Sequence, residues 1–323
     1  MFNRIHAPAF AIALMASGLA MGPLVAQDYP SRNIAIIVPQ PPGGGTDIIS
    51  RIVGAQLQTQ LKQIIDNRTG AGTIVGTVAA ANAAPDGYTL LTGLNANMAV
   101  NSSLYATLAY DPIRDFTPVA MMAEFPFVLV VSKDFPAKSV QELIAMAKAK
   151  PGEINVASAG NGSGQHLSLE LFKLMTGTDM THIPYRGASP AYTDVISGRT
   201  PVFFDNLSSA LGQIKSGTVR ALAVTGKERS AQLPDVPTVA ETIPDFQNYV
   251  WFGLWAPKKT PQAIIEKLHA EVKNAVADPE VQKRIAADAG VPMSTPLNEI
   301  EPMVKAEIAK WADVVKRANI KIQ

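Results

Sequence analysis

Two glycine-rich stretches, residues 39–47 and 158–164, each follow a short apolar run and lead into an amphipathic helical run. Glycines leave backbone N–H groups bare, and a helix start adds the positive end of its dipole, so such a turn favours an anion. The first stretch lacks the Gly-Lys-Ser/Thr ending of a phosphate-binding P-loop. The alternative is a structural turn capped by Thr46 or Asp47. The candidate ligand-binding residues of this stretch are Pro42, Gly43, Gly44, Gly45 and Thr46.

The second stretch, SAGNGSG, offers hydroxyl and amide groups at Ser158, Asn161 and Ser163. It does not match the dinucleotide-binding fingerprint, because Gln165 stands where the third glycine belongs. It is also no nucleophile elbow, because Asn161 occupies the glycine position required before the serine. Two anion-ready helix starts, one in each of two lobes, would hold a ligand carboxylate from both sides.

Four further polar side chains are candidates, and each has a structural alternative. His166 lies in the first turn after the second glycine stretch, where a lone histidine is more often a structural hydrogen-bonder. Arg186 follows an expected strand, where a guanidinium holds a carboxylate bidentately or else forms a surface ion pair. Asp205 and Asn95 end two other expected strands, where they would meet a hydroxyl, an amine or water.

Signals for catalysis, metals and cofactors are weak or missing. After the N-terminal segment the histidines are His166, His182 and His269, which lie far apart and lack metal-ligand spacing. The chain has no cysteine, which excludes disulfides, thiol catalysis and thiolate metal sites. We therefore expect no catalytic residue, no metal and no cofactor. The aromatic residues expected in the core rather than at the ligand site are Phe125, Phe127, Phe204, Trp251 and Phe252.

Residues 1–26 follow the order of a secretory signal peptide, with Arg4, an uncharged apolar stretch and a small residue, Ala26, at its end. A membrane anchor is the alternative, but the stretch is only just long enough to span and contains interrupting prolines and glycines. We expect cleavage after Ala26 and a periplasmic location. Cleavage removes one of 28 basic residues, so 27 basic residues balance 27 acidic ones. A neutral chain without a Lys/Arg tract is not expected to bind nucleic acid.

Short apolar runs alternate with amphipathic runs along the rest of the chain, which predicts an α/β fold of parallel-rich sheets flanked by helices. Its length favours two lobes. We expect lobe 1 to combine residues 27–123 and 226–323, lobe 2 to contain 124–225, and strands near 119–131 and 219–225 to cross between them. The C-terminal part is expected to be mainly helical, with Thr260 and Asp278 as caps, each followed by proline at the first helical position. Ser139 is expected to open an earlier helix through a capping box with Glu142.

Ordered motifs across the mature chain resemble the substrate-binding component of tripartite tricarboxylate transporters, also called the Bug family. These motifs are VPQPPGGGTD (38–47), NRTGAG (67–72), PDGYTLL (85–91), YDP (110–112), DFTPV (115–119), AGNGSGQHL (159–167), PYRG (184–187), FDN (204–206) and APKKTP (256–261). Each is modest alone, but their order and spacing together are specific. Two positions depart from the pattern, since Gln40 stands where many relatives carry an aromatic residue and Thr69 replaces a common proline.

The resemblance implies a two-lobe periplasmic-binding-protein fold, type II-like, with a deep cleft between the lobes. It implies that backbone amides, hydroxyls and water from residues 41–46 and 158–164 hold the carboxylate of a small organic ligand. It also implies membrane permease partners, one small subunit and one large.

The expected function is therefore that of an extracytoplasmic receptor, not an enzyme, that captures a small organic carboxylate and delivers it to a membrane transporter. One alternative is a periplasmic enzyme with Asp205 and His166 as an acid–base pair, against which the missing nucleophile and metal constellations argue. Another is a ligand-sensing partner of a membrane signalling protein, which would use the same lobe closure. No motif encodes the identity of the carboxylate.

Overall fold

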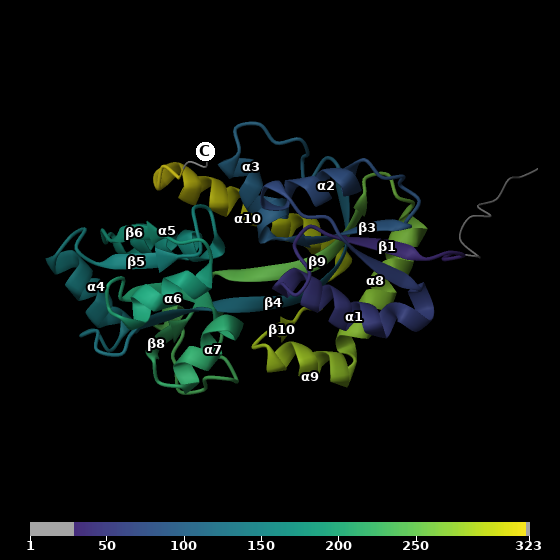
Figure 1. Cartoon of the computed structure of the whole chain (residues 1–323). Helices are drawn as coiled ribbons and strands as arrows, with labels where there is room; N and C mark the ends of the chain where they lie inside the picture. Colours follow the sequence, from purple (N-terminus) through teal and green to yellow (C-terminus); the bar gives the residue numbers. More distant parts are fainter. Residues whose placement is uncertain (1–28, 321–323) are drawn as a thin grey trace, which may run out of the picture.

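The computed structural model describes residues 29–320, so the predicted signal peptide lies outside the described residues. Within this range, no helix is both long enough and apolar enough to cross a membrane. Ten strands form one continuous sheet, in which the order along the main path is β2-β1-β3-β9-β4-β7-β5-β6. Helices cover the sheet on both sides (Figure 1).

The first half of the sheet begins with three parallel strands. β1 (Ile34–Val38) lies between β2 (Gln63–Asn67) and β3 (Thr89–Leu94). Four of the five residues of β1 are buried, as expected for an apolar strand that helices cover on both faces. β9 (Tyr249–Pro257) then runs antiparallel beside β3 and brings a distant part of the chain into the centre of the sheet.

β4 (Phe116–Ser132) joins the two halves of the sheet. Up to Pro126 it pairs with β9 and with the short β10 (Val291–Pro292). From Phe127 onward it pairs instead with β7 and β8 of the second half. Figure 1 shows β4 and β9 running side by side through the middle of the molecule.

The second half of the sheet continues from β4 through β7 (Val202–Asn206) to the parallel strands β5 (Asn155–Ser158) and β6 (Thr181–Pro184). β8 (Val219–Val224) pairs with β4, and its Val224 also forms an isolated bridge with Thr238. A mixed α/β sheet flanked by helices confirms the predicted fold class.

Ten α-helices complete the described fold, and the structure also contains a π-helical segment, η2 (Ala96–Val100). The helices are α1 (Gly45–Leu61), α2 (Ile74–Ala81), α3 (Asn101–Leu104), α4 (Val140–Ala149), α5 (Gly164–Thr176), α6 (Ala188–Ile196), α7 (Leu207–Lys215), α8 (Gln262–Ala277), α9 (Pro279–Ala287) and α10 (Leu297–Arg317). Short 3₁₀ turns occur at Ala71–Thr73 and Val239–Glu241. α10 packs against α3 and η2 in the first half and against α5 in the second, so it bridges both (Figure 1).

The three expected helix caps have different outcomes. Asp278 caps α9 as predicted, because its carboxylate accepts from the N–H groups of Glu280 and Val281. Ser139 caps α4 by accepting from the N–H of Glu142, but the Glu142 carboxylate accepts from the N–H of Lys138 instead of closing a reciprocal box on Ser139. Thr260 does not cap α8, since its hydroxyl donates to the carbonyl of Pro257.

The return connection between the halves differs from the prediction. β8 was expected to cross, yet it pairs with β4 inside the second half. The chain returns through residues 225–248 and enters β9, with the N–H of Asn248 donating to the carbonyl of Thr225 (3.2 Å). β9 is a second difference, because the prediction of a mainly helical C-terminal part contains no strand at Tyr249–Pro257. The proposed lobe boundaries stay a prediction.

One hydrophobic core extends across both halves on the α10 side. It contains Trp255 and Trp311 from the first half together with Phe172 and Phe204 from the second. Two smaller cores lie under α1 and α8 in the first half and under α6 and α7 in the second. The halves are therefore held together on one side by shared apolar packing, in addition to the strands that join them.

Candidate ligand-binding site

A cavity of about 580 Å³ lies where the two halves of the sheet meet. Residues from the starts of α1, α5 and α7 line it, and the helix-start residues on its wall include Gly45, Ser163, Gly164 and Ser208. Five of the twelve predicted ligand-binding residues lie on this wall, namely Gly43, Gly45, Thr46, Asn95 and Ser163. Helices and strands far apart in sequence thus place both predicted glycine stretches at one cavity.

The first glycine stretch is braced from behind by Asp47. The N–H of Gly43 donates to Asp47 Oδ2 (2.9 Å), while Arg51 Nε and Asn67 Nδ2 donate to the same carboxylate (2.9 and 3.0 Å). The hydrogen bond from Arg51 is the main cause that lowers the pKa of Asp47 to about 2, so this brace is ionised at neutral pH. Gly43 has φ +81°, a left-handed conformation that favours glycine.

The start of α1 has no side-chain cap. Its cap residue is Gly44, and the Thr46 hydroxyl donates to Gln40 Oε1 instead of capping the helix. Gln40, the position that departs from the family pattern, also lies on the cavity wall. The first N–H groups of α1 therefore stay open to a ligand within the described part of the chain.

The second glycine stretch is shaped by close packing. A Cβ on Gly164 would lie 2.5 Å from Cζ of Phe127, so only glycine lets the start of α5 approach this ring. Ser163 caps α5, with Oγ accepting from the N–H of His166 (3.3 Å), and keeps its own O–H to donate. Gly162 has φ +74°, and its N–H donates to His166 Nδ1 (3.1 Å).

Ser158 and His166 lie behind the second loop and not on the cavity wall. The hydroxyl of Ser158 is 2.6 Å from His182 Nε2, and the rings of His166 and His182 stack at 3.8 Å and 7°. Burial is the main cause that lowers the pKa of His166 to about 3 and that of His182 to about 4. Both rings are neutral at pH 7 and support the loop through their contacts with Ser158 and Gly162.

The other predicted residues lie away from the cavity wall. Pro42, Asn161 and Arg186 are exposed, and Gly44 is the backbone cap described above. Asp205 is fully buried, and burial raises its pKa. Its Oδ1 accepts from Gln165 Nε2 (3.3 Å), so it stands one residue behind the wall.

Aromatic residues that the sequence placed in the core form the apolar part of the site. Phe125, Phe127 and Phe252 line the cavity, and the rings of Phe125 and Phe252 meet edge to face at 5.6 Å. Phe204 and Trp251 are core residues, as predicted. The available signal was the i, i+2 spacing of Phe125 and Phe127, which puts both side chains on one face of a strand.

Polar wall residues were also missed. Gln165, Asn206, Ser208 and Ser209 line the cavity from α5 and from the start of α7. The wall has no Lys, Arg or His among the described residues, and its one charged side chain is Asp288 at the end of α9. Any attraction for an anion therefore comes from helix starts, backbone N–H groups and hydroxyls.

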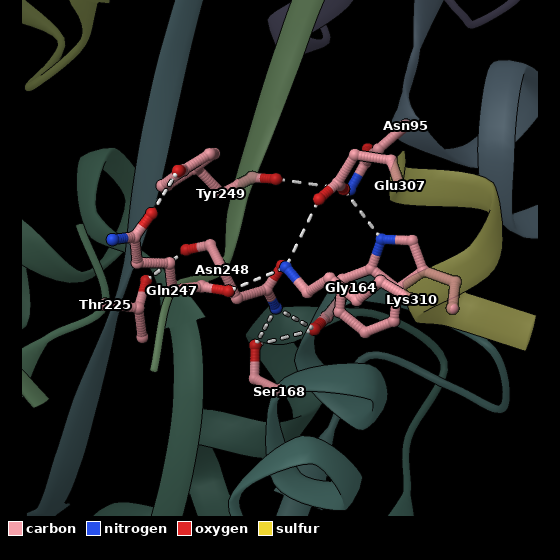
Figure 2. Close-up of polar contacts among 10 residues, drawn as sticks. Asn95, Gly164, Ser168, Thr225, Gln247, Asn248, Tyr249, Glu307 and Lys310 are labelled. Carbon is pink, nitrogen blue, oxygen red and sulfur yellow. Dashed lines mark hydrogen bonds and ion pairs between the residues drawn. The ribbon is translucent and has the colours of Figure 1, made fainter. Parts of the chain in front are cut away.

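A polar network behind the cavity ties the start of α5 to the segment that enters β9 (Figure 2). Asn248 Nδ2 donates to Ser168 Oγ (2.6 Å) and to the Gly164 carbonyl (3.4 Å). On the other side of this segment, Lys310 Nζ of α10 donates to the Gln247 carbonyl (2.8 Å). Elements of both halves are thus cross-linked at one point.

The fold is that of periplasmic binding proteins such as BugD, and solved structures match most of the chain. Rpa4515 of R. palustris, solved with adipate, is 35% identical with TM-score 0.78 and covers 91% of this chain and 99% of its own. MatC of Rhodopseudomonas palustris, solved with malate, is 34% identical with TM-score 0.73 and covers 89% of this chain and 100% of its own.

The sequence itself matches a curated relative along almost its whole length. Protein BugT of Bordetella pertussis is 38% identical over 316 residues, or 97% of each chain. The family described as tripartite tricarboxylate transporter family receptor matches residues 49–320. The chain belongs to this family, which confirms the resemblance read from its motifs and the prediction of a receptor instead of an enzyme.

Proposed function

We propose that this protein captures a small organic carboxylate in the cavity between its halves and delivers it to a tripartite tricarboxylate-type membrane transporter with one small and one large permease subunit. The convergence of three helix starts on a cavity whose described wall holds no cationic side chain carries the proposal. Helix N-termini bind anions through bare N–H groups and the dipole, and they do so without a counter-ion.

The carboxylate is assigned to the starts of α1 and α5, where Gly45, Thr46 and Ser163 lie on the wall. The aromatic floor made by Phe125, Phe127 and Phe252 would cover the carbon skeleton of the ligand. Relatives solved with adipate and with malate support a carboxylate and also indicate that the rest of the ligand varies within the family.

Delivery to a transporter requires export, which the predicted signal peptide would supply. Intact-mass analysis of the exported protein tests this step, with a chain beginning at residue 27 as the expected result. A product that retains residues 1–26 would contradict the proposed cleavage.

A thermal-shift screen of the purified mature protein against small organic acids, sugars and cationic amino-acid derivatives tests the binding function. An acid at about 100 times its Kd is expected to add about 2.7 kcal/mol of stability. Stabilisation by sugars or cations with no response to any acid would overturn the proposal.

A further inference from the structure

Two side-chain amides on the cavity wall, Asn95 and Gln165, come from opposite halves of the molecule. Both are almost buried, with 5% and 6% of their surface exposed. Asn95 follows β3 in the first half, and Gln165 lies in the first turn of α5 in the second. The carboxylate site proposed at the helix starts uses N–H groups and hydroxyls, and it gives these two side-chain amides no role.

Internal acceptors fix the orientation of both amides. Gln165 Nε2 donates to Asp205 Oδ1 and Asn95 Nδ2 donates to the Tyr249 carbonyl, each at 3.3 Å. A carbonyl oxygen only accepts, so the –NH₂ end of Asn95 must face inward. Asp205 is fully buried, and its Oδ1 is the acceptor for Gln165 Nε2.

The carbonyl ends of the two amides are left for the cavity. Neither Asn95 Oδ1 nor Gln165 Oε1 accepts a hydrogen bond from the described residues, and neither is a fully buried unpaired atom. Both oxygens therefore keep access to solvent, and both residues line the cavity. The carboxylate of Asp288 adds a third oxygen acceptor to the same wall.

Oxygen acceptors repel a carboxylate and attract an O–H or N–H group. We propose that the ligand carries a hydrogen-bond donor, a hydroxyl or an ammonium group, on the carbon chain next to its carboxylate, and that Asn95 Oδ1 and Gln165 Oε1 receive it. The inference rests on the proposed function and narrows its substrate class to hydroxy- or amino-carboxylates. The helix starts hold the carboxylate, and the two amide oxygens select the donor.

Matched acids that differ in one substituent test the inference by calorimetry: propionate, lactate and alanine; succinate, malate and aspartate; glutarate, 2-hydroxyglutarate and glutamate. In the set with the best-fitting chain length, the hydroxy or amino acid is expected to bind at least about tenfold more tightly than the plain acid, since a missing donor leaves buried acceptors unpaired. Plain acids that bind as tightly as their substituted partners would overturn the inference and leave the proposed function standing. Failure of every acid to bind would instead overturn the proposed function.

Two variants locate the selection. Gln165→Met and Asn95→Leu each remove one acceptor at similar volume, and each is expected to weaken binding of the substituted acid more than binding of the plain acid, so that the preference falls several-fold. Gln262→Met, at an exposed glutamine that starts α8, is the matched control and should leave the preference unchanged. If the preference survives in both folded variants, the two amides do not select the ligand.

Discussion

Ser163 caps a helix and also lines the cavity. Its oxygen accepts from the N–H of His166 and so caps α5, while the residue also lies on the cavity wall. Ser163 is therefore expected to affect both the stability of the fold and the affinity for the ligand. A substitution that preserves the cap would change the affinity alone.

Ser163→Asp is expected to keep or slightly raise the melting temperature and to abolish tight binding. A carboxylate caps a helix as well as a hydroxyl and suits its dipole by about 0.3–1 kcal/mol. A ligand carboxylate at the same place would meet a like charge, which at about 4 Å and an effective dielectric of 20 costs about 4 kcal/mol. We expect affinity to fall about 100-fold or more by calorimetry.

Ser139→Asp is the matched control, because Ser139 caps α4 in the same way and does not line the cavity. It should leave affinity unchanged. If Ser163→Asp folds normally and binds the acid at wild-type strength, the start of α5 is not part of the anion site.

A substitution of Arg186 tests whether this side chain anchors the ligand carboxylate or is only a surface residue. A bidentate carboxylate anchor would make Arg186→Ala weaken binding by one to two decades, about 1.5–3 kcal/mol. The side chain is exposed and lies off the cavity wall, so we expect calorimetry to give an affinity within about twofold of the wild type. A loss of tenfold or more would show that Arg186 reaches the ligand in the bound state.

The stacked pair His166 and His182 predicts acid sensitivity. Both pKa values lie below the ordinary 6.5, so the unfolded chain takes up protons first as the pH falls. The contribution of the two histidines to the free energy of unfolding is therefore fully present above about pH 6.5. It decreases as the pH falls toward 4, by up to about 1.4 kcal/mol per pH unit for each histidine.

His166→Asn keeps an acceptor for the N–H of Gly162 and removes one titrating ring. Urea unfolding at pH 6 and pH 5 should show a smaller loss of stability in the variant, by about 1.2 kcal/mol between the two pH values. Glu170, whose pKa burial raises, contributes with the opposite sign, and its Oε1 lies 3.8 Å from His166 Nε2, so Glu170→Gln in both proteins removes its contribution from the comparison. Equal slopes would mean that His166 does not titrate differently in the folded and unfolded states.

At the scale of elements, the cavity wall depends on how α5 is attached to the segment that enters β9. Asn248 makes that attachment through Ser168 and the Gly164 carbonyl (Figure 2). Asn248→Leu removes both donated hydrogen bonds at similar volume, and we expect a loss of about 1–3 kcal/mol in the free energy of unfolding. Affinity for the acid should fall several-fold, because the first turn of α5 loses its anchor.

Asn82→Leu is the control, since Asn82 is exposed and donates only to a carbonyl of its own helix. Calorimetry and chemical denaturation on both variants check the prediction. Normal affinity in a destabilised Asn248→Leu would show that α5 keeps its position without this contact.

Elements with a strong local pattern were predictable from the sequence. The apolar run at β1 and the cap at Asp278 both specify their elements through neighbours in the chain. β9 was missed because its residues, YVWFGLWAP, become a strand through pairing with β3 and β4, which are distant in sequence. Glycine-rich helix starts were likewise visible as possible anion sites, since their chemistry is local.

The rest of the site depends on packing that no local pattern encodes. Phe127 is fully buried and still lines the cavity, because Gly164 packs directly against its ring. Asp205 ends a strand as a ligand residue would, yet Gln165 stands between it and the cavity. Whether a side chain lines the cavity or lies behind a lining residue depends on how the two halves of the sheet pack together.

At the scale of the whole molecule, the shared core limits how the halves can move. Trp311 of α10 and Phe172 of α5 belong to one continuous core, so that side of the molecule opposes separation. β4 and β9 lie side by side between the halves and supply the remaining connection. A motion that changes the cavity should therefore pivot about these strands. The largest displacement is expected at α7 and α9, which lie on the side of the molecule opposite to α10 (Figure 1).

Spin labels at Ser216→Cys, just after α7, and Lys283→Cys, in α9, test this motion, because the natural chain has no cysteine to interfere. Both positions are exposed and lie off the cavity wall, so labelling should leave binding intact. A ligand shifts the population only if it binds the closed form better, and contacts from both halves supply that difference. Pulsed electron–electron distance measurements should show the distance shortening by more than about 2 Å on addition of the acid. A second pair, Lys148→Cys with Ser216→Cys, lies within one half and should keep its distance. If the acid binds and neither distance changes, the cavity binds its ligand without closure, and the transporter proposed as its partner would have to recognise the complex in another way.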